Sequence, residues 1–247
     1  MRLLHTTLTP EGLFEQSEFA GDGIPRYAIL SHAWGDSEIT LRDVEAGRGR
    51  GKAGHEKVEK CCDRAKADGF DYAWVDTCCI DKTSSAELSE AINSMYRWYQ
   101  NADICYAYLS DVPSSGARRF EESRWFTRGL TLQELIAPSR IIFFDQTWVE
   151  IGTKTTLGEM IMHRTGIPFA VLNGDPGAVE RATVAQRMSW ASTRQTTRVE
   201  DIAYCLLGIF GVNMPLLYGE GERAFIRLQE EIIKISDDHS IFAWQSE

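Results

Sequence analysis

Residues 27–34 read YAILSHAW. The first four residues form an apolar run, and the polar pair Ser31 and His32 follows it. Three other runs have the same character, since each is rich in β-branched or aromatic residues and none alternates strictly with polar ones. The four runs are residues 27–30, 72–75, 104–109 and 140–144. Continuous runs of this kind are typical of strands that are covered on both faces, as in a parallel sheet.

Segments with a helical spacing of apolar residues lie between these runs. They are residues 57–67, 87–102 and 124–137. Ser84 and Glu87 have the S-x-x-E spacing of a capping box at the start of the second segment, and Pro138 would stop the third. The alternation predicts an α/β fold with a doubly wound parallel sheet, whose right-handed crossovers place all strand carboxyl ends on one rim.

The last hundred or so residues have a different pattern. Residues 183–191, 199–210 and 223–235 have the spacing of helices, and residues 240–244 form a final apolar piece. We therefore expect a single domain, with an α/β core at residues 1–150 and a mostly helical C-terminal subdomain at residues 151–247 packed on it. The chain ends at FAWQSE without a tail, which suggests a segment of a longer polypeptide.

The composition argues against several kinds of partner. The chain has 26 basic and 36 acidic residues, a formal net charge of −10, which is unsuited to the phosphate backbone of a nucleic acid. No stretch approaches the roughly 20 apolar residues of a membrane span. The N-terminus, MRLLHTTLTPEG, is too short and polar for a signal peptide. These observations predict a cytoplasmic protein.

Six cysteines are present, and four of them form the adjacent pairs Cys61–Cys62 and Cys78–Cys79. Adjacent cysteines are poorly placed to bind one metal ion, and the sequence contains neither a C-x-x-C nor an H-x-x-x-H spacing. We therefore expect reduced thiols in the core, with no metal site and no disulfide framework.

Polar or ionisable side chains follow every predicted strand. They are Ser31, His32 and Trp34 after the first run, Asp76 after the second, Asp111 after the third and Asp145 after the fourth. Open α/β sheets bind their ligands at this rim, so the sequence predicts a binding site there.

A nucleophilic Ser31–His32 pair is disfavoured. Neighbours at a strand end project to different sides, and the G-x-S-x-G pattern of a hydrolase elbow is absent. Ligand contact and loop-ordering hydrogen bonds remain two interpretations of these side chains and of Trp34. Asp76 is a candidate acceptor for a ribose or another hydroxyl.

Glu134 is the one acidic residue in the stretch SRWFTRGLTLQELIAPS, residues 123–139. Thr131 and Glu134 have T-x-x-E spacing, so Glu134 could complete a capping box at a helix start. The alternative is a helix that begins earlier, near Arg124. Glu134 is then a half-buried carboxylate among leucines, which needs a partner or a function.

Five stretches of this chain resemble the fungal HET (heterokaryon incompatibility) domain. They are YAILSHAWG, YAWVDTCCIDK, AINSMYRWYQNADICYAYLSDV, SRWFTRGLTLQELIAPS and RVEDIAYCLLGIFGVNMPLLYGEGERAFIRLQEEIIK. The resemblance covers nearly the whole chain. It implies a cytosolic cell-death effector, found at the N-terminus of NACHT-type, NLR-like (STAND) proteins and switched on when the attached regions self-associate.

The HET domain is in turn similar to the TIR domain, which has a flavodoxin-like fold. NAD-cleaving TIR domains carry a glutamate in a W-C-x-x-E-L segment, and GLTLQEL aligns Glu134 with it. Typical HET sequences have tryptophan at the position of Leu130. TIR domains also act as scaffolds without catalysis.

The resemblance leads to the hypothesis that the domain cleaves NAD at its nicotinamide–ribose bond, with NAD as substrate and no other cofactor. Glu134 would stabilise the ribosyl cation. Trp34 and Trp125 would supply aromatic faces, and Arg128 a pyrophosphate contact. The remaining polar walls would come from Ser31, His32 and Asp76.

Two other functions remain open at this point. The domain could be a non-enzymatic module that triggers cell death through homotypic assembly. It could also be a hydrolase or transferase that acts on nucleosides rather than on NAD.

Overall fold

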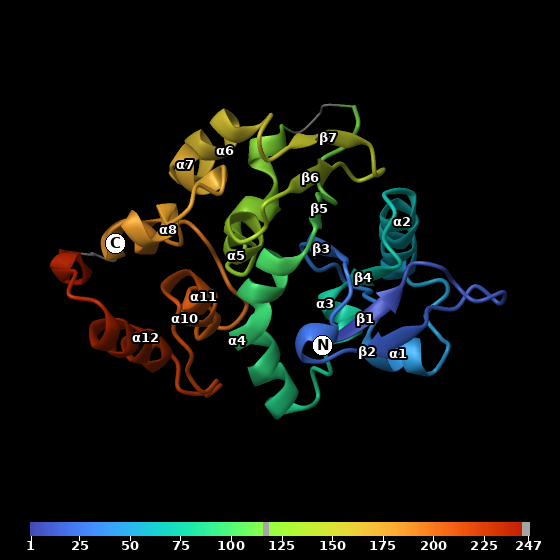
Figure 1. Ribbon diagram of the computed structural model, residues 1–247, viewed down its shortest axis with the longest axis horizontal. Coiled ribbons are helices and arrows are strands. Elements are labelled where there is room, and N and C mark those ends of the chain that lie inside the picture. Colours follow the sequence, from blue (N-terminus) through green and yellow to red (C-terminus); the bar gives the residue numbers. More distant parts are fainter. Residues whose placement is uncertain (116–118, 244–247) are drawn as a thin grey trace.

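The computed structural model of the protein describes residues 1–115 and 119–243. Its described residues form a seven-stranded sheet in the order β2–β1–β4–β3–β5–β6–β7 (Figure 1). The four central strands are mutually parallel and coincide with the four apolar runs, which confirms these predicted strands. They are β3 (Ala28–His32), β4 (Tyr72–Trp74), β5 (Ile104–Tyr108) and β6 (Ile141–Phe144).

The sheet is mixed rather than wholly parallel, so the predicted parallel sheet needs a correction. Antiparallel strands flank the central four: β1 (Arg2–His5) and β2 (Gln16–Glu18) on one side and β7 (Glu150–Thr153) on the other. β7 can lie antiparallel because the turn after β6 is short. Asp145 closes this turn by accepting hydrogen bonds from the backbone N–H groups of Thr147 and Val149, at 2.8 and 3.0 Å.

The order of the central strands creates a switch point beside β3. The chain passes from β3 to β4 on one side and then crosses to β5 on the other side. Helix α2 (Ala53–Ala67) covers one face of these strands, whereas α4 (Ser85–Asn101) and α5 (Thr131–Ile136) cover the other (Figure 1). Ligands of doubly wound sheets bind at such a point, outside the carboxyl ends of the strands.

The predicted helix at residues 124–137 is interrupted. A 3-10 turn, η3 (Arg124–Thr127), precedes α5, which begins only at Thr131. Between them the backbone pairs with a distant segment: Gln195 N–H donates to the Thr127 carbonyl at 2.6 Å, and Gly129 N–H donates to the Gln195 carbonyl at 2.9 Å. This long-range pairing takes the place of helical hydrogen bonds and explains the break.

The capping box predicted before α4 is half formed. The Ser84 hydroxyl accepts from Glu87 N–H at 3.3 Å, as expected of an N-cap. The Glu87 carboxylate instead accepts from Asp81 N–H at 2.7 Å and pairs with the Arg2 guanidinium. Glu87 therefore joins β1 and the turn at Asp81 to the start of α4.

The C-terminal part is helical, as predicted. The long helix α12 (Arg223–Ile235) has the predicted bounds, whereas residues 199–210 form two short helices, α10 (Asp201–Tyr204) and α11 (Leu207–Phe210). The predicted helix at 183–191 is α9 (Val184–Ser189), and the final apolar piece is a 3-10 helix, η4 (His239–Ala243), with Trp244 outside the described residues.

Several shorter elements complete the fold. They are α1 (Leu41–Glu45), α3 (Asp76–Cys79), α6 (Gly158–Thr165), α7 (Phe169–Leu172), α8 (Ala178–Arg181), η1 (Gly21–Gly23) and η2 (Phe120–Glu122). Within residues 1–115 and 119–243, no helix has the length and apolar character that crossing a bilayer requires.

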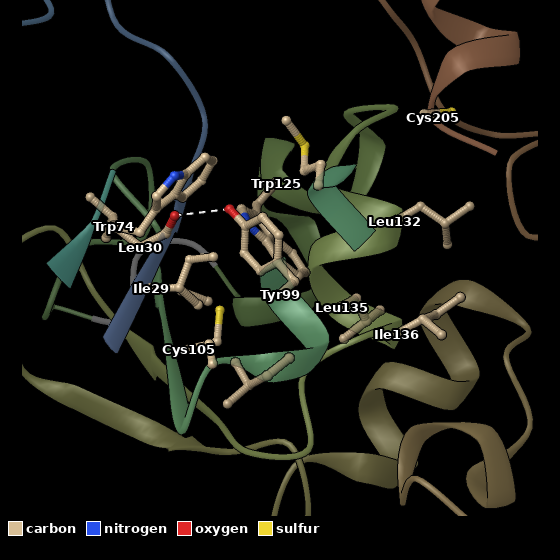
Figure 2. Packing of buried hydrophobic residues seen from close by; sticks show 14 of the residues in the cluster. Ile29, Leu30, Trp74, Tyr99, Cys105, Trp125, Leu132, Leu135, Ile136 and Cys205 are labelled. Atoms are coloured by element: carbon tan, nitrogen blue, oxygen red, sulfur yellow. Dashed lines mark hydrogen bonds between the residues drawn. The ribbon is translucent and has the colours of Figure 1, made fainter. Parts of the chain in front are cut away.

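One core fills the space between the sheet and the helices, and the site rests on it. In Figure 2, Tyr99 of α4 lies between the β3 residues Ile29 and Leu30 and the apolar side chains of α5, and its hydroxyl donates to the Leu30 carbonyl at 2.9 Å. All six cysteines are buried and unbonded, which confirms the expected core thiols. Burial raises the pKa of these thiols, and it raises that of Cys79 to about 12.

Candidate functional site

A cavity of about 400 Å³ opens beside the carboxyl ends of β3 and β4. Its lining comes from the strand ends, from α4 and α5, and from two C-terminal segments. The lining side chains that carry charge or hydrogen-bonding groups include His32, Trp34, Asp76, Lys82, Arg128, Thr131, Glu134, Gln195, Thr196, Thr197, Arg198, Asp201 and Tyr218. The cavity thus lies at the predicted rim, and its size suits a small organic ligand.

Glu134 borders this cavity from α5 and is only 7% exposed. A Glu134 carboxylate oxygen accepts a hydrogen bond from the Ser31 hydroxyl, which in turn accepts from the indole Nε1–H of Trp125 at 2.7 Å. The residue before α5, Leu130, provides no side-chain cap, and Glu134 does not close a capping box. Glu134 does lie in the first turn of α5, as the helix-start interpretation expects, but the capping box of that interpretation is not formed.

Burial raises the pKa of Glu134 to about 8, and the negative charge of Asp76 acts in the same direction. The hydrogen bond from Ser31 opposes this shift without cancelling it. Without ligand, Glu134 is therefore mostly protonated near pH 7, and a positive charge brought close to it would favour its ionisation.

His32 is held by two partners from different elements. Lys57 Nζ, on α2, lies 2.7 Å from His32 Nδ1, and because an ammonium can only donate, Nδ1 must be the acceptor. The ring proton then resides on Nε2 and is donated to Asp76 Oδ1 at 3.0 Å. Neither ring nitrogen is free to act as a base, and Ser31 bonds to Glu134 instead, so a Ser31–His32 nucleophile pair is absent.

Asp76 is the centre of a second hydrogen-bond group. Its Oδ2 accepts from Trp34 Nε1 at 2.8 Å and lies 3.3 Å from Lys82 Nζ. Burial alone would raise the pKa of Asp76, but the Lys82 ammonium and the His32 hydrogen bond outweigh burial and hold this pKa far below its ordinary value. Asp76 is therefore an ionised group that orients its neighbours.

Trp34 is 46% exposed at the mouth of the cavity, and Lys82 Nζ lies 3.4 Å from the centre of its ring. One face of the indole is thus occupied by a cation. Trp125, by contrast, is only 1% exposed and does not line the cavity. The expected aromatic face at Trp125 is not available to a ligand. Trp125 and the fully buried Ser31 instead fix the position of Glu134 through the hydrogen bonds that link the three side chains in the core.

Two buried cations that sequence patterns did not reveal hold α5 at its ends. Arg194 Nη1 donates to the Arg128 carbonyl at 2.8 Å and to Thr131 Oγ1 at 2.9 Å. Lys154 Nζ donates to the carbonyls of Pro138 and Ile136, at 2.9 and 3.2 Å. Burial lowers the pKa of Arg194 to about 10 and that of Lys154 to about 8.

The outer wall of the cavity comes from the C-terminal part of the chain, which sequence patterns also did not assign to the site. Tyr218 lies in a loop before α12, and its hydroxyl donates to Asp201 Oδ1 at 2.9 Å. Glu200 anchors this loop by accepting from the N–H groups of Gly219 and Gly221, at 2.7 and 3.1 Å. Both glycines have positive φ, 104° and 64°, a backbone conformation that glycine adopts without steric cost. Glycines at these positions are the sequence signal for this tight loop.

Replacing Gly129 by alanine is expected to loosen the contact between the turn before α5 and the segment at 195–198. The added Cβ would lie 2.4 Å from Thr196 Cγ2, and Thr196 cannot rotate freely because its Oγ1 donates to the Arg198 carbonyl at 2.6 Å. We expect a loss of about 1–3 kcal/mol in the free energy of unfolding, measured with urea.

The double variant Gly129→Ala/Thr196→Ser is the matched control, because serine keeps the hydroxyl and removes Cγ2. It should recover most of the lost stability. An equal loss in the single and double variants would contradict the assigned clash.

The fold and the cavity together define an α/β domain with a strand-end cavity around a buried carboxyl group. Residues 27–117 match the family model described as "Heterokaryon incompatibility protein (HET)", and residues 223–247 match one described as "Domain of unknown function (DUF8212)". The Vegetative incompatibility protein HET-E-1 of Podospora anserina is 49% identical over 223 residues, which cover 85% of this chain.

The chain therefore contains a HET domain and belongs to the heterokaryon incompatibility family. It spans 16% of the length of the Podospora relative. Glu134 and the C-terminal wall of the cavity lie outside the segment that the HET family model matches. No solved structure matches the chain.

Proposed function

We propose that this domain is a cell-death effector of fungal incompatibility that hydrolyses the nicotinamide–ribose bond of NAD. The observation that carries the proposal is the buried Glu134 carboxyl, which is hydrogen-bonded to Ser31 and borders a cavity at the carboxyl ends of β3 and β4. A buried carboxyl group with a raised pKa and specific partners at the edge of a cavity is a candidate functional group, which supports the proposal.

The strand order supports a TIR-like, flavodoxin-like interpretation of the core. Numbered along the chain, the parallel strands β4, β3, β5 and β6 have the order second, first, third, fourth. Flavodoxin-like sheets have this order and bind their ligand between the first and third strands. Glu134 reaches the end of the first of these strands, where it meets Ser31, from the helix that follows the third parallel strand.

The reaction needs one well-placed anion. When the C–N bond breaks, its electron pair goes to the nicotinamide nitrogen, which leaves as a neutral ring and needs no proton. The ribosyl carbon becomes an oxocarbenium-like cation, which ionised Glu134 stabilises. Water then forms the new C–O bond and releases a proton to solvent. The positive charge of the nicotinamide ring favours ionisation of Glu134 as the substrate binds.

The biological role follows the relative, whose printed name is that of a vegetative incompatibility protein. In a longer protein, this domain would be joined to NACHT-type regions, and their self-association would open the site. Loss of NAD would then kill the cell. A purely scaffolding role is the competing outcome, and it predicts no nicotinamide release at any concentration of the assembled protein.

The pH dependence of nicotinamide release tests the proposal. We expect kcat/KM for NAD to rise from about pH 6 to about pH 9 with a midpoint near 8, because only ionised Glu134 is active and burial raises its pKa to about 8. Below the midpoint, the rise should be about tenfold per pH unit. The midpoint for kcat should be lower, because the bound nicotinamide cation lowers the pKa of Glu134.

Blanks without protein correct for the alkaline breakdown of NAD. A rate that falls over the same pH range would show that the protonated carboxyl acts as an acid, which contradicts the proposed role. No release above the blank at any pH would end the enzymatic proposal.

A further inference from the structure

Two arginines at the cavity, Arg128 and Arg198, form no ion pair with the described residues of the chain. No ion pair of Arg128 or Arg198 within 4.0 Å occurs among residues 1–115 and 119–243, although the whole chain carries a net charge of −10. Other cationic side chains at the cavity differ in this respect, since Lys82 pairs with Asp76. Although acidic residues are in excess over the whole chain, these two guanidinium groups at the cavity have no ion pair with the described residues.

Arg198 is held in position by its own neighbours. Its guanidinium carbon lies 4.2 Å from the centre of the Tyr218 ring, a cation–π contact. Tyr218 is fixed in turn by its hydrogen bond to Asp201. Since no carboxylate in residues 1–115 or 119–243 accepts a hydrogen bond from it, the Arg198 guanidinium keeps its donors for a ligand while it lies over an aromatic ring.

The two arginines reach the cavity from segments that are far apart in the chain but paired in space. Arg128 lies in the turn before α5, and a parallel bridge joins it to Gln195, three residues before Arg198. Gly129 permits this approach, because a side chain there would collide with Thr196. The core and the C-terminal part thus each contribute one guanidinium to the cavity.

The other charges at the cavity leave it favourable for an anion. Asp76 is balanced by Lys82, and the raised pKa of Glu134 keeps that group mostly protonated near pH 7 in the absence of ligand. Asp201 already accepts the Tyr218 hydroxyl, and burial raises its pKa even though the charge of Arg198 acts in the opposite direction. Two phosphates joined as a diphosphate suit two guanidinium forks, which bind phosphate oxygens in pairs.

We infer that Arg198, together with Arg128, forms a clamp for the diphosphate of the substrate, so that the site selects a diphosphate-linked dinucleotide over a nucleoside. This inference rests on the proposed NAD hydrolysis and deepens it. Arg198 is a binding and specificity residue, distant from the bond that breaks. The C-terminal part of the chain is then required for substrate selection as well as for covering the core.

The experiment compares two substrates that have the same scissile bond. NAD has the diphosphate, and nicotinamide riboside lacks it. For Arg198→Ala we expect kcat/KM for NAD to fall about 10- to 100-fold, mainly through KM, and kcat/KM for nicotinamide riboside to change by less than about twofold. Arg198→Lys should recover part of the loss. Arg223→Ala, which alters an exposed arginine at the start of α12, is the matched control and should change neither substrate.

An equal loss for both substrates in Arg198→Ala would overturn the clamp, as would wild-type protein that cleaves nicotinamide riboside as efficiently as NAD. Calorimetric binding of ADP-ribose separates this inference from the proposed reaction. If the wild-type protein cleaves neither substrate, NAD hydrolysis fails, but the clamp still predicts that Arg198→Ala weakens ADP-ribose binding at least about tenfold relative to Arg223→Ala. Unchanged ADP-ribose binding, or none to the wild type, would overturn the clamp.

Discussion

Replacing Glu134 by glutamine is expected to reduce kcat/KM for NAD by about a thousandfold at alkaline pH, where the wild-type carboxyl group is ionised. Glutamine has nearly the same shape and can still accept the hydrogen bond from Ser31, so the hydrogen bonds that link Trp125, Ser31 and residue 134 should persist. Only the negative charge is lost, and with it the stabilisation of the ribosyl cation. Nicotinamide release, measured near pH 8.5, reports the effect directly.

Asp145 provides the control for this experiment. It is also a carboxylate that follows a central strand, but its oxygens accept from Ser114, Thr147 and Val149 and it does not line the cavity. Asp145→Asn should leave kcat/KM for NAD within about twofold of the wild type once the folded fraction is matched. Equal activity of Glu134→Gln and wild type would exclude the assigned role of Glu134.

The same Glu134→Gln substitution is expected to stabilise the protein at high pH. The pKa of Glu134 is about 8 in the folded state against 4.5 ordinarily, so between these values the unfolded chain releases a proton that the folded protein keeps. The free energy of unfolding of the wild type therefore falls as pH rises through this window, by at most about 1.4 kcal/mol per pH unit. Glutamine does not ionise and avoids this loss.

Urea unfolding near pH 5 and pH 9 measures the difference. The two proteins should have similar stability near pH 5, and Glu134→Gln should be more stable by about 2–4 kcal/mol near pH 9. Lys154 does not confuse the comparison, because it is present in both proteins and its lowered pKa acts mainly above pH 8.

Asp145→Asn should behave in the opposite way. Burial alone would raise the pKa of Asp145, but hydrogen bonds from Ser114 and Thr147 outweigh burial and lower it, so the ionised form stabilises the fold above its ordinary pKa. Removing that charge should lower stability at neutral and high pH. If Glu134→Gln also lost stability at pH 9, Glu134 would be a structural carboxylate and the functional proposal would lose its main support.

The central strands could be predicted because each is a continuous apolar run, and such a run by itself indicates a strand that is buried on both faces. The edge strands could not. Gln16–Glu18 contains no apolar residue, and its pairing depends on the partner strand β1. The break before α5 was missed for a related reason. Its cause is the pairing with Gln195, a contact that no local pattern contains.

The inner half of the site follows from strand ends, and the outer half does not. His32 ends β3, and Trp34 and Asp76 come shortly after β3 and β4. Right-handed crossovers bring such residues to one edge of the sheet, independently of the C-terminal part of the chain. Arg198 and Tyr218 arrive from a segment whose position depends on how the C-terminal helices pack. Trp125 was misjudged because an aromatic residue near a site can lie beneath it as easily as beside it, and only its 1% exposure distinguishes these cases.

The grip of Arg194 and Lys154 on the two ends of α5 limits how this protein can be regulated. Any shift of that helix would strand two cations in the interior, each deprived of the carbonyl or hydroxyl oxygens that now surround it, and an uncompensated buried charge costs about 3–5 kcal/mol. Glu134 therefore already has its position in the molecule without ligand. Under the proposed function, we expect activation to change the contact between Gln195 and Gly129 at the cavity rather than the position of α5.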